Sequence, residues 1–314
     1  MLDCRLLDAA PPLPENALAL VSFGAAARAG ADPRRVRVPL PALAGPAHER
    51  WTARAPVRTG TDNGIAWARG DDALFGQMAL PDGAPYAATI EAAYARILSF
   101  VEAQRFPHLL RCWNYFGDIH AGAGDEERYR QFCAGRYRAL SAAPDFESRL
   151  PAATVIGSAE PGTLIYFFAA REPGRQVENP RQVSAFRYPR EYGPNAPSFS
   201  RAVLKPWDGG TQLFVSGTAS VVGHLSVHGG DAGAQFRETL ANLRALLQAA
   251  AGVAGAPGAW QPVALKVYVR EPAALPAVRR QVTETLGTRA PVLFLQGDIC
   301  RTDLSVEIEG LFRP

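Results

Sequence analysis

The last two expected strands lie in the stretch Phe294-Leu-Gln-Gly-Asp-Ile-Cys-Arg-Thr-Asp-Leu-Ser-Val-Glu-Ile-Glu309. From Leu304 to Glu309 apolar and polar residues alternate, which is the period of a half-buried strand. The apolar set is expected to face a core, so Glu307 faces either solvent or a cleft. Residues 291–299 and 303–312 are therefore expected to form a final hairpin, with Cys300 in the turn between the strands.

The rest of the second half of the chain is also expected to form regular strands and helices. The expected order is an antiparallel hairpin followed by β-α-β-α-β-β, with helices on one face of a mixed sheet. The helices are expected at 231–249 and 273–286, where Asp231 is placed to cap the first of them. Strands are expected at 153–158, 163–171, 199–206, 212–222 and 261–270, with a long loop over 172–198.

The first half reads as short strands interrupted by Pro and Gly, followed by helix, strand and helix. The helices are expected at 86–105 and 126–143, with a strand at 108–117 between them. At 314 residues the chain is long for one domain, and Pro144–Pro151 reads as a linker. The prediction is a two-domain α+β protein divided into residues 1–148 and 149–314. Whether the N-terminal domain is a degenerate copy of the C-terminal one stays open.

Composition argues against several functional classes. The formal net charge of +3 is spread along the chain without a basic cluster, so nucleic acid is not an expected partner. No apolar run or N-terminal signal indicates a membrane segment, and the expected location is cytoplasmic. The sequence contains no P-loop, GxGxxG or GxSxG motif, so no cofactor is predicted.

Metal binding is also not predicted. His224 and His228 are four residues apart, near Asp231, but a turn follows them where a metal pair would need a helix. The four cysteines are widely spaced, which suggests neither a zinc site nor a disulfide framework. They are Cys4, Cys112, Cys133 and Cys300.

Three other segments carry side chains suited to binding a ligand. The proline-rich loop 188–202 contains Tyr192 and Arg201, and long ordered loops tend to be functional. Gly217 and Thr218 lie near the end of a strand, where glycine permits close approach of a ligand. Arg270 ends another strand. The alternatives are a surface excursion, a packing bulge and a surface arginine.

A set of segments between about residues 105 and 310 carries a resemblance to known proteins. The segments are Leu110-Arg-Cys-Trp-Asn-Tyr115, Glu127-Arg-Tyr-Arg-Gln-Phe132, Gly135-Arg136, Tyr188-Pro-Arg190, Tyr192-Gly-Pro194, Pro197-Ser-Phe-Ser-Arg-Ala202, Phe214-Val-Ser-Gly-Thr-Ala-Ser220, Lys266-Val-Tyr-Val-Arg270, Cys300-Arg301 and Val306-Glu-Ile-Glu309. Together, these segments resemble the chorismatase family, which is related to the YjgF (Rid) superfamily. The resemblance implies a YjgF-like C-terminal domain, in agreement with the expected strand and helix order.

The resemblance implies chorismate as substrate and loss of its enolpyruvyl side chain as pyruvate. Glu307 is then expected to protonate the enol ether methylene, which requires a desolvated carboxylic acid. The resemblance also implies that Cys300 marks enzymes that aromatise the ring to 3-hydroxybenzoate, with 4-hydroxybenzoate as a further product left open. The expected substrate-binding residues are Arg201, Tyr192, Arg270, Gly217, Thr218 and Gln296.

Other functions remain open from the sequence. A hydrolytic chorismatase would release a dihydroxycyclohexadiene carboxylate together with pyruvate. A Rid-type imine or enamine deaminase would need only the C-terminal half, and a metabolite-binding protein would bind chorismate without turnover. The expected oligomeric state is a monomer or a homotrimer.

Overall fold

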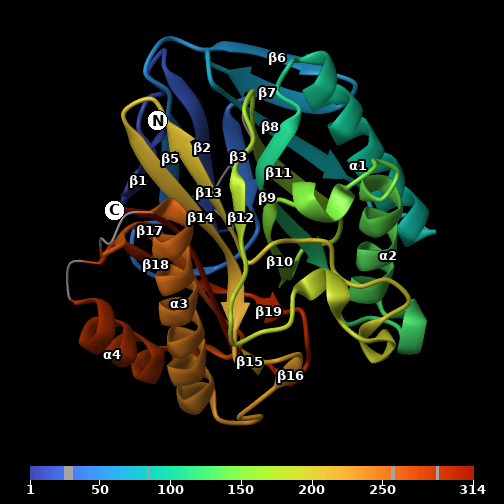
Figure 1. The fold of residues 1–314 in the computed structure, drawn as a ribbon, viewed down its shortest axis with the longest axis vertical. Coiled ribbons are helices and arrows are strands. Elements are labelled where there is room, and N and C mark those ends of the chain that lie inside the picture. Colours follow the sequence, from blue (N-terminus) through green and yellow to red (C-terminus); the bar gives the residue numbers. More distant parts are fainter. Residues whose placement is uncertain (25–30, 84, 256–258, 288–289) are drawn as a thin grey trace.

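The computed structural model describes residues 1–24, 31–83, 85–255, 259–287 and 290–314 of the chain. Three main sheets pack against one another, and a pair of helices covers the outer face of each seven-stranded sheet (Figure 1). The helices are α1 (Tyr86–Ala103), α2 (Arg128–Leu140), α3 (Ala232–Ala254) and α4 (Leu275–Leu286). The fold class is α+β, as predicted. No helix within the described ranges combines the length and apolar character that a transmembrane segment requires.

The first sheet has four strands and the other two main sheets have seven each. The first has the order β1 (Asp3–Leu7), β5 (His48–Thr52), β2 (Ala17–Phe23) and β3 (Arg35–Val38). The second has the order β19 (Asp298–Ile299), β10 (Ala152–Ser158), β9 (His108–Gly117), β11 (Thr163–Ala170), β8 (Ala73–Leu80), β7 (Ile65–Arg69) and β6 (Arg58–Asp62). The third has the order β12 (Arg175–Val177), β13 (Ala202–Trp207), β14 (Gly210–Ala219), β20 (Val306–Arg313), β17 (Gln261–Val269), β18 (Val292–Gln296) and β4 (Ala42–Ala44). A small two-stranded sheet joins β15 (Val221–Val222) to β16 (Leu225–Ser226).

The second and third sheets repeat one topology. In the second, β7 and β8 are followed by α1, β9, α2, β10 and β11, and the strand order is 7-8-11-9-10. In the third, β13 and β14 are followed by α3, β17, α4, β18 and β20, and the corresponding order is 13-14-20-17-18. The pairing directions agree, with β9–β10 and β17–β18 parallel and the other corresponding pairs antiparallel. This agreement supports a degenerate copy in the N-terminal half.

The repeat does not divide where the linker was expected. A boundary between residues 148 and 149 would separate β10 and β11 from β9 and β8, with which they pair. The topological units instead end at Ala170 and begin again at Ala202, with residues 171–201 between them. Local composition marked residues 144–151 as a linker, but strand pairing is a long-range property.

The expected final hairpin is also wrong. β18 and β20 do not pair, because β17 lies between them. β17 and β18 are parallel strands joined through α4, so β18 occupies the far side of β17. The chain then contributes β19 to the second sheet, beside β10, before it returns to the third sheet as β20. Alternation correctly predicted a strand at β20 but carried no information about its neighbours.

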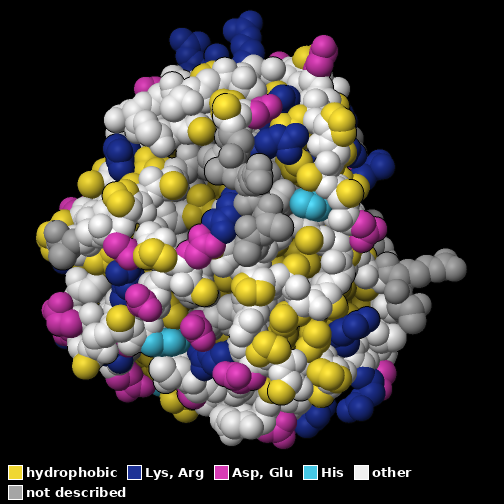
Figure 2. All heavy atoms as spheres, turned by 180° about the vertical axis from the view of Figure 1, so that it is seen from behind, with side chains coloured by type: hydrophobic (Ala, Val, Ile, Leu, Met, Phe, Trp, Pro, Cys, Tyr) yellow, Lys and Arg dark blue, Asp and Glu magenta, His cyan; other side chains and the backbone are white. Residues whose placement is uncertain are grey.

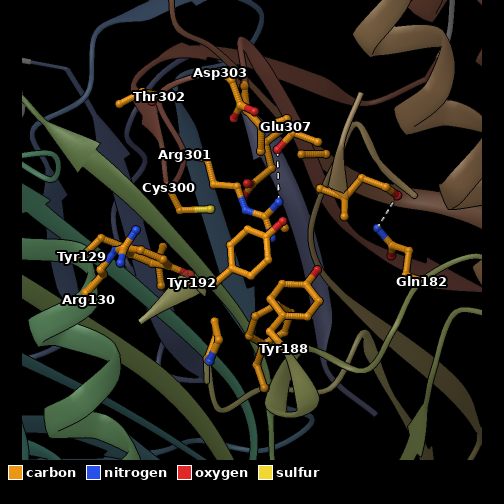
Figure 3. Close-up of a pocket in the computed structure, with 18 of the residues that line it drawn as sticks. Tyr129, Arg130, Gln182, Tyr188, Tyr192, Cys300, Arg301, Thr302, Asp303 and Glu307 are labelled. Atoms are coloured by element: carbon orange, nitrogen blue, oxygen red, sulfur yellow. Dashed lines mark hydrogen bonds between the residues drawn. The ribbon is translucent and has the colours of Figure 1, made fainter. Parts of the chain in front are cut away.

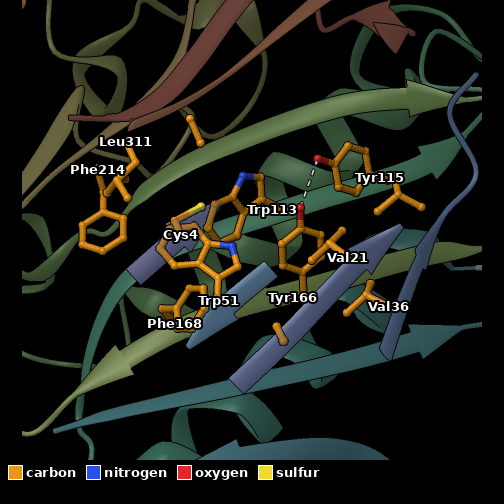
Figure 4. Packing of buried hydrophobic residues seen from close by; sticks show 14 of the residues in the cluster. Cys4, Val21, Val36, Trp51, Trp113, Tyr115, Tyr166, Phe168, Phe214 and Leu311 are labelled. Carbon is orange, nitrogen blue, oxygen red and sulfur yellow. Dashed lines mark hydrogen bonds between the residues drawn. The ribbon is translucent and has the colours of Figure 1, made fainter. Parts of the chain in front are cut away.

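A shared core joins the three sheets, and two outer cores lie beneath the helix pairs. Trp51 from the first sheet lies 4.7 Å from Phe168 of the second and 6.2 Å from Phe214 of the third, between ring centroids (Figure 4). Asp231 caps α3 as predicted, since its carboxylate accepts a hydrogen bond of 2.8 Å from the amide of Ala234. On the face shown in Figure 2, cationic and anionic side chains are interspersed.

Candidate active site

A cavity of about 450 Å³ lies where the second and third sheets meet (Figure 3). Its walls come from β10, β14 and β20, from the start of α2, and from two loops. The lining residues used below are Glu127, Tyr129, Arg130, Thr154, Tyr188, Tyr192, Arg201, Gly217, Ser226, Cys300, Arg301 and Glu307. The volume is in the range typical of pockets for small molecules.

Glu307 lies on the face of β20 that is turned towards the second sheet. Its neighbours Val306 and Ile308 enter the core beneath α3, so the alternation places Glu307 on the opposite face. That face is not open to solvent, because Glu307 is only 5% exposed. A β-carbon at position 217 would lie 1.9 Å from Glu307 Oε1, so the carboxyl occupies the space that the glycine leaves free.

Burial raises the pKa of Glu307 to about 8. The negative charge of Glu309 contributes to this rise, whereas the cations Arg111 and Arg201 oppose it. No hydrogen bond from a described residue reaches the Glu307 carboxyl to stabilise its ionised form. Glu307 is therefore mainly a neutral acid near pH 7 and can donate a proton.

A buried cluster of four charges lies behind Glu307. Glu309 accepts from Arg111 at 2.6 Å and pairs with Lys266 at 2.8 Å, and Lys266 also pairs with Glu49 at 2.6 Å. Against the effect of burial, the cations Lys266 and Arg111 lower the pKa of Glu309, so this carboxylate stays ionised. Two neighbouring glutamates on one strand face thus have opposite protonation states.

Thr154 joins this charge cluster to the cavity wall. Its hydroxyl donates to Glu309 and accepts a hydrogen bond of 3.1 Å from the amide of Gly217. Because Gly217 packs directly against Glu307, these contacts fix the backbone on which the acid rests. The Gly217 amide is consequently engaged and does not face the cavity as a free anion donor.

Two arginines line the cavity without forming an ion pair to any described carboxylate. Arg201 is 5% exposed, and its guanidinium donates to the Val183 carbonyl at 2.8 Å and to the Tyr188 hydroxyl at 2.7 Å, while its Nε–H has no partner among the described residues. Arg301 donates to the His224 carbonyl at 2.8 Å, and its guanidinium carbon lies 4.0 Å from the Tyr192 ring centroid. Arg201 is buried and Arg301 is half-buried, and guanidinium groups withdrawn from water normally have anionic partners, so this wall is suited to an anionic ligand.

Cys300 faces the same cavity from the turn that follows β19. Burial, with a smaller contribution from the nearby Glu307, raises the pKa of its thiol to about 12. The sulfur is therefore a protonated thiol near neutral pH. It can take part in hydrogen bonding or proton movement, but the site does not favour a thiolate nucleophile.

The cavity brings together five of the eight residues predicted from the sequence. These are Glu307, Cys300, Arg201, Tyr192 and Gly217. Thr218, Arg270 and Gln296 do not line it. The Thr218 hydroxyl donates to the Ser216 carbonyl at 3.0 Å, and the Gln296 side-chain amide lies 3.5 Å from the Arg270 carbonyl. The Arg270 guanidinium binds the backbone carbonyls of Ile299, Arg301 and Thr302. Alternation along a strand gives the side of a residue but not how far it lies from a cavity.

Sequence reasoning also missed several lining residues. Arg301 adjoins Cys300 in a segment already noted for the family resemblance, so its charge and position were available as a signal. Tyr129 belongs to the resemblance segment at the start of α2, but nothing distinguished it from a helix-core aromatic. Thr154 lies in an ordinary apolar strand and carried no signal at all.

The two histidines have other partners than a metal. His228 Nε2 lies 3.1 Å from Glu238 Oε2, and His224 Nδ1 lies 3.4 Å from the Tyr192 hydroxyl. The second contact places His224 beside the cavity mouth, next to the ring on which Arg301 stacks.

Comparisons with known proteins extend over nearly the whole chain. Residues 49–169 match the family model described as chorismatase FkbO/Hyg5-like, N-terminal. The chain is 42% identical over 273 residues to a chorismatase from Streptomyces rapamycinicus, covering 84% of this chain and 81% of the relative. It is 36% identical over 316 residues to a 3-hydroxybenzoate synthase from Streptomyces hygroscopicus, covering 96% of this chain and 93% of the relative. A crystal structure of a chorismatase superposes with a TM-score of 0.88 at 34% identity, covering 99% of this chain and 98% of the other.

Proposed function

The chain belongs to the chorismatase family, and from this membership we propose that it converts chorismate and releases its enolpyruvyl side chain as pyruvate. We further propose that the ring product is 3-hydroxybenzoate. The relative named 3-hydroxybenzoate synthase supports this choice over 96% of the chain. Cys300 at the cavity supports it from within this molecule.

One observation carries the proposal: two guanidinium groups without ion-pair partners and a neutral carboxylic acid line a single cavity. Chorismate is a dicarboxylate with an enol ether, so it needs two cationic partners and one proton donor. Arg201 and Arg301 fit the first requirement, since both are free of ion pairs to described residues. Glu307 fits the second, with its pKa raised to about 8 by burial.

The reaction begins with transfer of the Glu307 proton to the terminal methylene carbon of the enol ether. The side-chain carbon then becomes an oxocarbenium ion, and the carboxylate left on Glu307 stabilises it electrostatically. Capture of this ion by water gives a hemiketal, whose collapse breaks the bond between the side-chain carbon and the ether oxygen, so pyruvate leaves and the ring keeps a hydroxyl. Capture by the neighbouring ring hydroxyl instead gives a cyclic ketal, and the ring C–O bond of that hydroxyl must also break before pyruvate leaves with its oxygen. Behind Glu307, the cations Arg111 and Lys266 compensate the negative charge of Glu309.

The product depends on what happens to the ring. Pyruvate and a hydroxybenzoate together contain the atoms of chorismate, whereas pyruvate and the dihydroxycyclohexadiene carboxylate require one added water. After capture by water, the aromatic product therefore needs a ring proton and a ring hydroxyl to be lost as water. After capture by a ring hydroxyl, that oxygen leaves in pyruvate and only the ring proton remains to be removed. A protonated Cys300 thiol at the cavity wall can assist this proton movement without a covalent adduct.

A single chain supplies every residue described in the cavity wall. The cavity lies between two sheets of one molecule. We therefore propose that a monomer is sufficient for catalysis.

The test is incubation of the purified protein with chorismate, followed by separation of the ring products. The expected result is pyruvate in equal amount to 3-hydroxybenzoate, with the aromatic fraction reduced in Cys300→Ala. A non-aromatic diol from the unaltered protein would place it among hydrolytic chorismatases. Absence of pyruvate would refute the proposed activity, and ammonia release from an imine would favour the deaminase alternative.

A further inference from the structure

The turn that carries Cys300 and Arg301 has little support from its own strand. β19 contains only Asp298 and Ile299, and it pairs with β10 through these two positions. The next regular strand begins at Val306. Residues 300–305 therefore need other contacts if they are to hold two side chains at the cavity wall.

Gln235 holds the far end of this segment, through Asp303 and Ser305, and Arg270 supplies the contacts next to Cys300. Its Nη2 donates to the carbonyls of Ile299 at 3.0 Å and Arg301 at 2.9 Å, and its Nη1 donates to the carbonyl of Thr302. Its Nε donates to the Asp298 carboxylate at 3.2 Å. The guanidinium thus binds the residues on both sides of Cys300 and leaves the Cys300 side chain free to face the cavity.

His120 connects this arrangement to Glu127 and Arg130, which line the cavity at the start of α2. Its Nε2 lies 3.2 Å from Arg270 Nη2 and must accept the hydrogen bond, because a guanidinium can only donate. The ring proton is then on Nδ1, which lies 3.4 Å from Glu127 Oε1. Glu127 accepts from Arg130 Nε at 3.0 Å, and both of these residues line the cavity.

Glu307 is supported separately from this arrangement. It lies within β20 against Gly217, and none of the contacts of Arg270 involves it. A change at Arg270 should therefore move Cys300 and Arg301 while leaving the proton donor in place. Arg270 itself does not line the cavity, so its effect on the reaction must act through the turn.

We propose that Arg270 and His120 are positioning residues that hold the Cys300–Arg301 turn against the cavity and thereby control how the ring product is partitioned. This inference rests on the proposed conversion of chorismate. It assigns Arg270 a role different from the carboxylate binding that its place at a strand end suggested. Arg301, rather than Arg270, is then the second carboxylate-binding arginine.

The test compares Arg270→Lys and His120→Gln with the unaltered protein. Lysine keeps the charge but cannot bind several carbonyls in one plane. For Arg270→Lys we expect KM to rise about 10-fold and the aromatic fraction to fall at least ~3-fold, while kcat for pyruvate release stays within about 3-fold. Glutamine can still accept from Arg270, so His120→Gln should lie closer to the unaltered protein than His120→Ala. Arg280→Lys, an exposed change on α4, is the matched control.

A second measurement does not depend on turnover. The rate of Cys300 alkylation by iodoacetamide, followed on the Cys300 peptide by mass spectrometry, should increase at least ~5-fold in Arg270→Lys as the turn loosens. Unchanged KM, product ratio and alkylation rate in folded Arg270→Lys and His120→Ala would overturn the inference. If the unaltered protein releases no pyruvate from chorismate, the proposed function fails, and the alkylation rate still decides whether Arg270 positions the turn.

Discussion

Replacement of Gly217 by alanine should strongly reduce the activity of this protein and cost it little stability. Gly217 lies in β14, directly opposite the Glu307 carboxyl. An added β-carbon would lie 1.9 Å from Oε1, 2.7 Å from Cδ and 3.4 Å from Cγ of that side chain. The end of the acid, rather than the backbone of β20, therefore has to move.

The size of the effect follows from these distances. Ordinary van der Waals contact requires a separation of about 3.5 Å, so the carboxyl must shift by roughly 1.5 Å. Misplacement of a reacting group by about 1 Å can cost on the order of 100-fold in rate, so we expect kcat to fall at least that much. The cost to stability should be near the lower end of the ~1–3 kcal/mol typical of overpacking, because the side chain can turn into the cavity.

The assay is pyruvate release from chorismate, combined with the urea midpoint of unfolding. Gly252→Ala is the matched control, since this helical glycine has open space around its β-carbon position. The control should keep full activity and gain about 0.5–1 kcal/mol of stability. The reasoning is refuted if Gly217→Ala keeps kcat within about 3-fold of the unaltered protein.

Three further changes test the electrostatics of the site. Glu307 keeps its proton up to about pH 8 in the folded protein, whereas its ordinary pKa is 4.5. Between these pH values the folded state binds more protons than the unfolded state, so the free energy of unfolding falls as the pH rises. Glu307→Gln should remove this loss and be more stable than the unaltered protein by up to ~4 kcal/mol at pH 7.5, measured by urea unfolding at several pH values. Lys266→Met leaves two buried carboxylates with one cation and should cost about 3–5 kcal/mol in the same assay; a loss below about 1 kcal/mol would contradict the buried pairing. Arg201→Lys should lower kcat/KM for chorismate ~10- to 100-fold without a matching loss of thermal stability, and an unchanged kcat/KM would remove Arg201 from the site.

Local sequence patterns predicted the elements of this fold but not their arrangement. The alternation around Glu307 correctly placed a strand there, and the strand at 108–117 was predicted with the bounds observed for β9. The partners of β18 and β20 were wrong, because the pattern of one strand holds no record of its neighbours. For the same reason the linker expected at 144–151 lies within one topological unit.

The candidate site was predicted where a residue type carried its own chemical signal. A carboxylate in an apolar strand and an arginine in a long polar loop both reached the cavity, as Glu307 and Arg201. Thr154 was missed because a threonine in an apolar strand is ordinary. Arg270 was assigned to substrate binding because the sequence cannot show that its donors are already used by backbone carbonyls.

The burial of Glu307 and Glu309 was the property hardest to predict from the sequence. Alternation alone left open whether Glu307 faces solvent or a cleft, yet Glu307 and Glu309 are only 5% and 2% exposed. Their burial results from packing of the third sheet against the second, together with cations supplied from β9 and β17. Only the assembled sheets make one carboxyl neutral and the other ionised.

The central claim is that Glu307 protonates the enol ether, and the rate of pyruvate release from chorismate by Glu307→Gln tests it most directly. Glutamine keeps the size of the side chain and removes the transferable proton. The account predicts a fall in kcat of about 10²- to 10⁴-fold in a protein that remains folded. A folded Glu307→Gln variant that releases pyruvate within about 3-fold of the unaltered rate would contradict it.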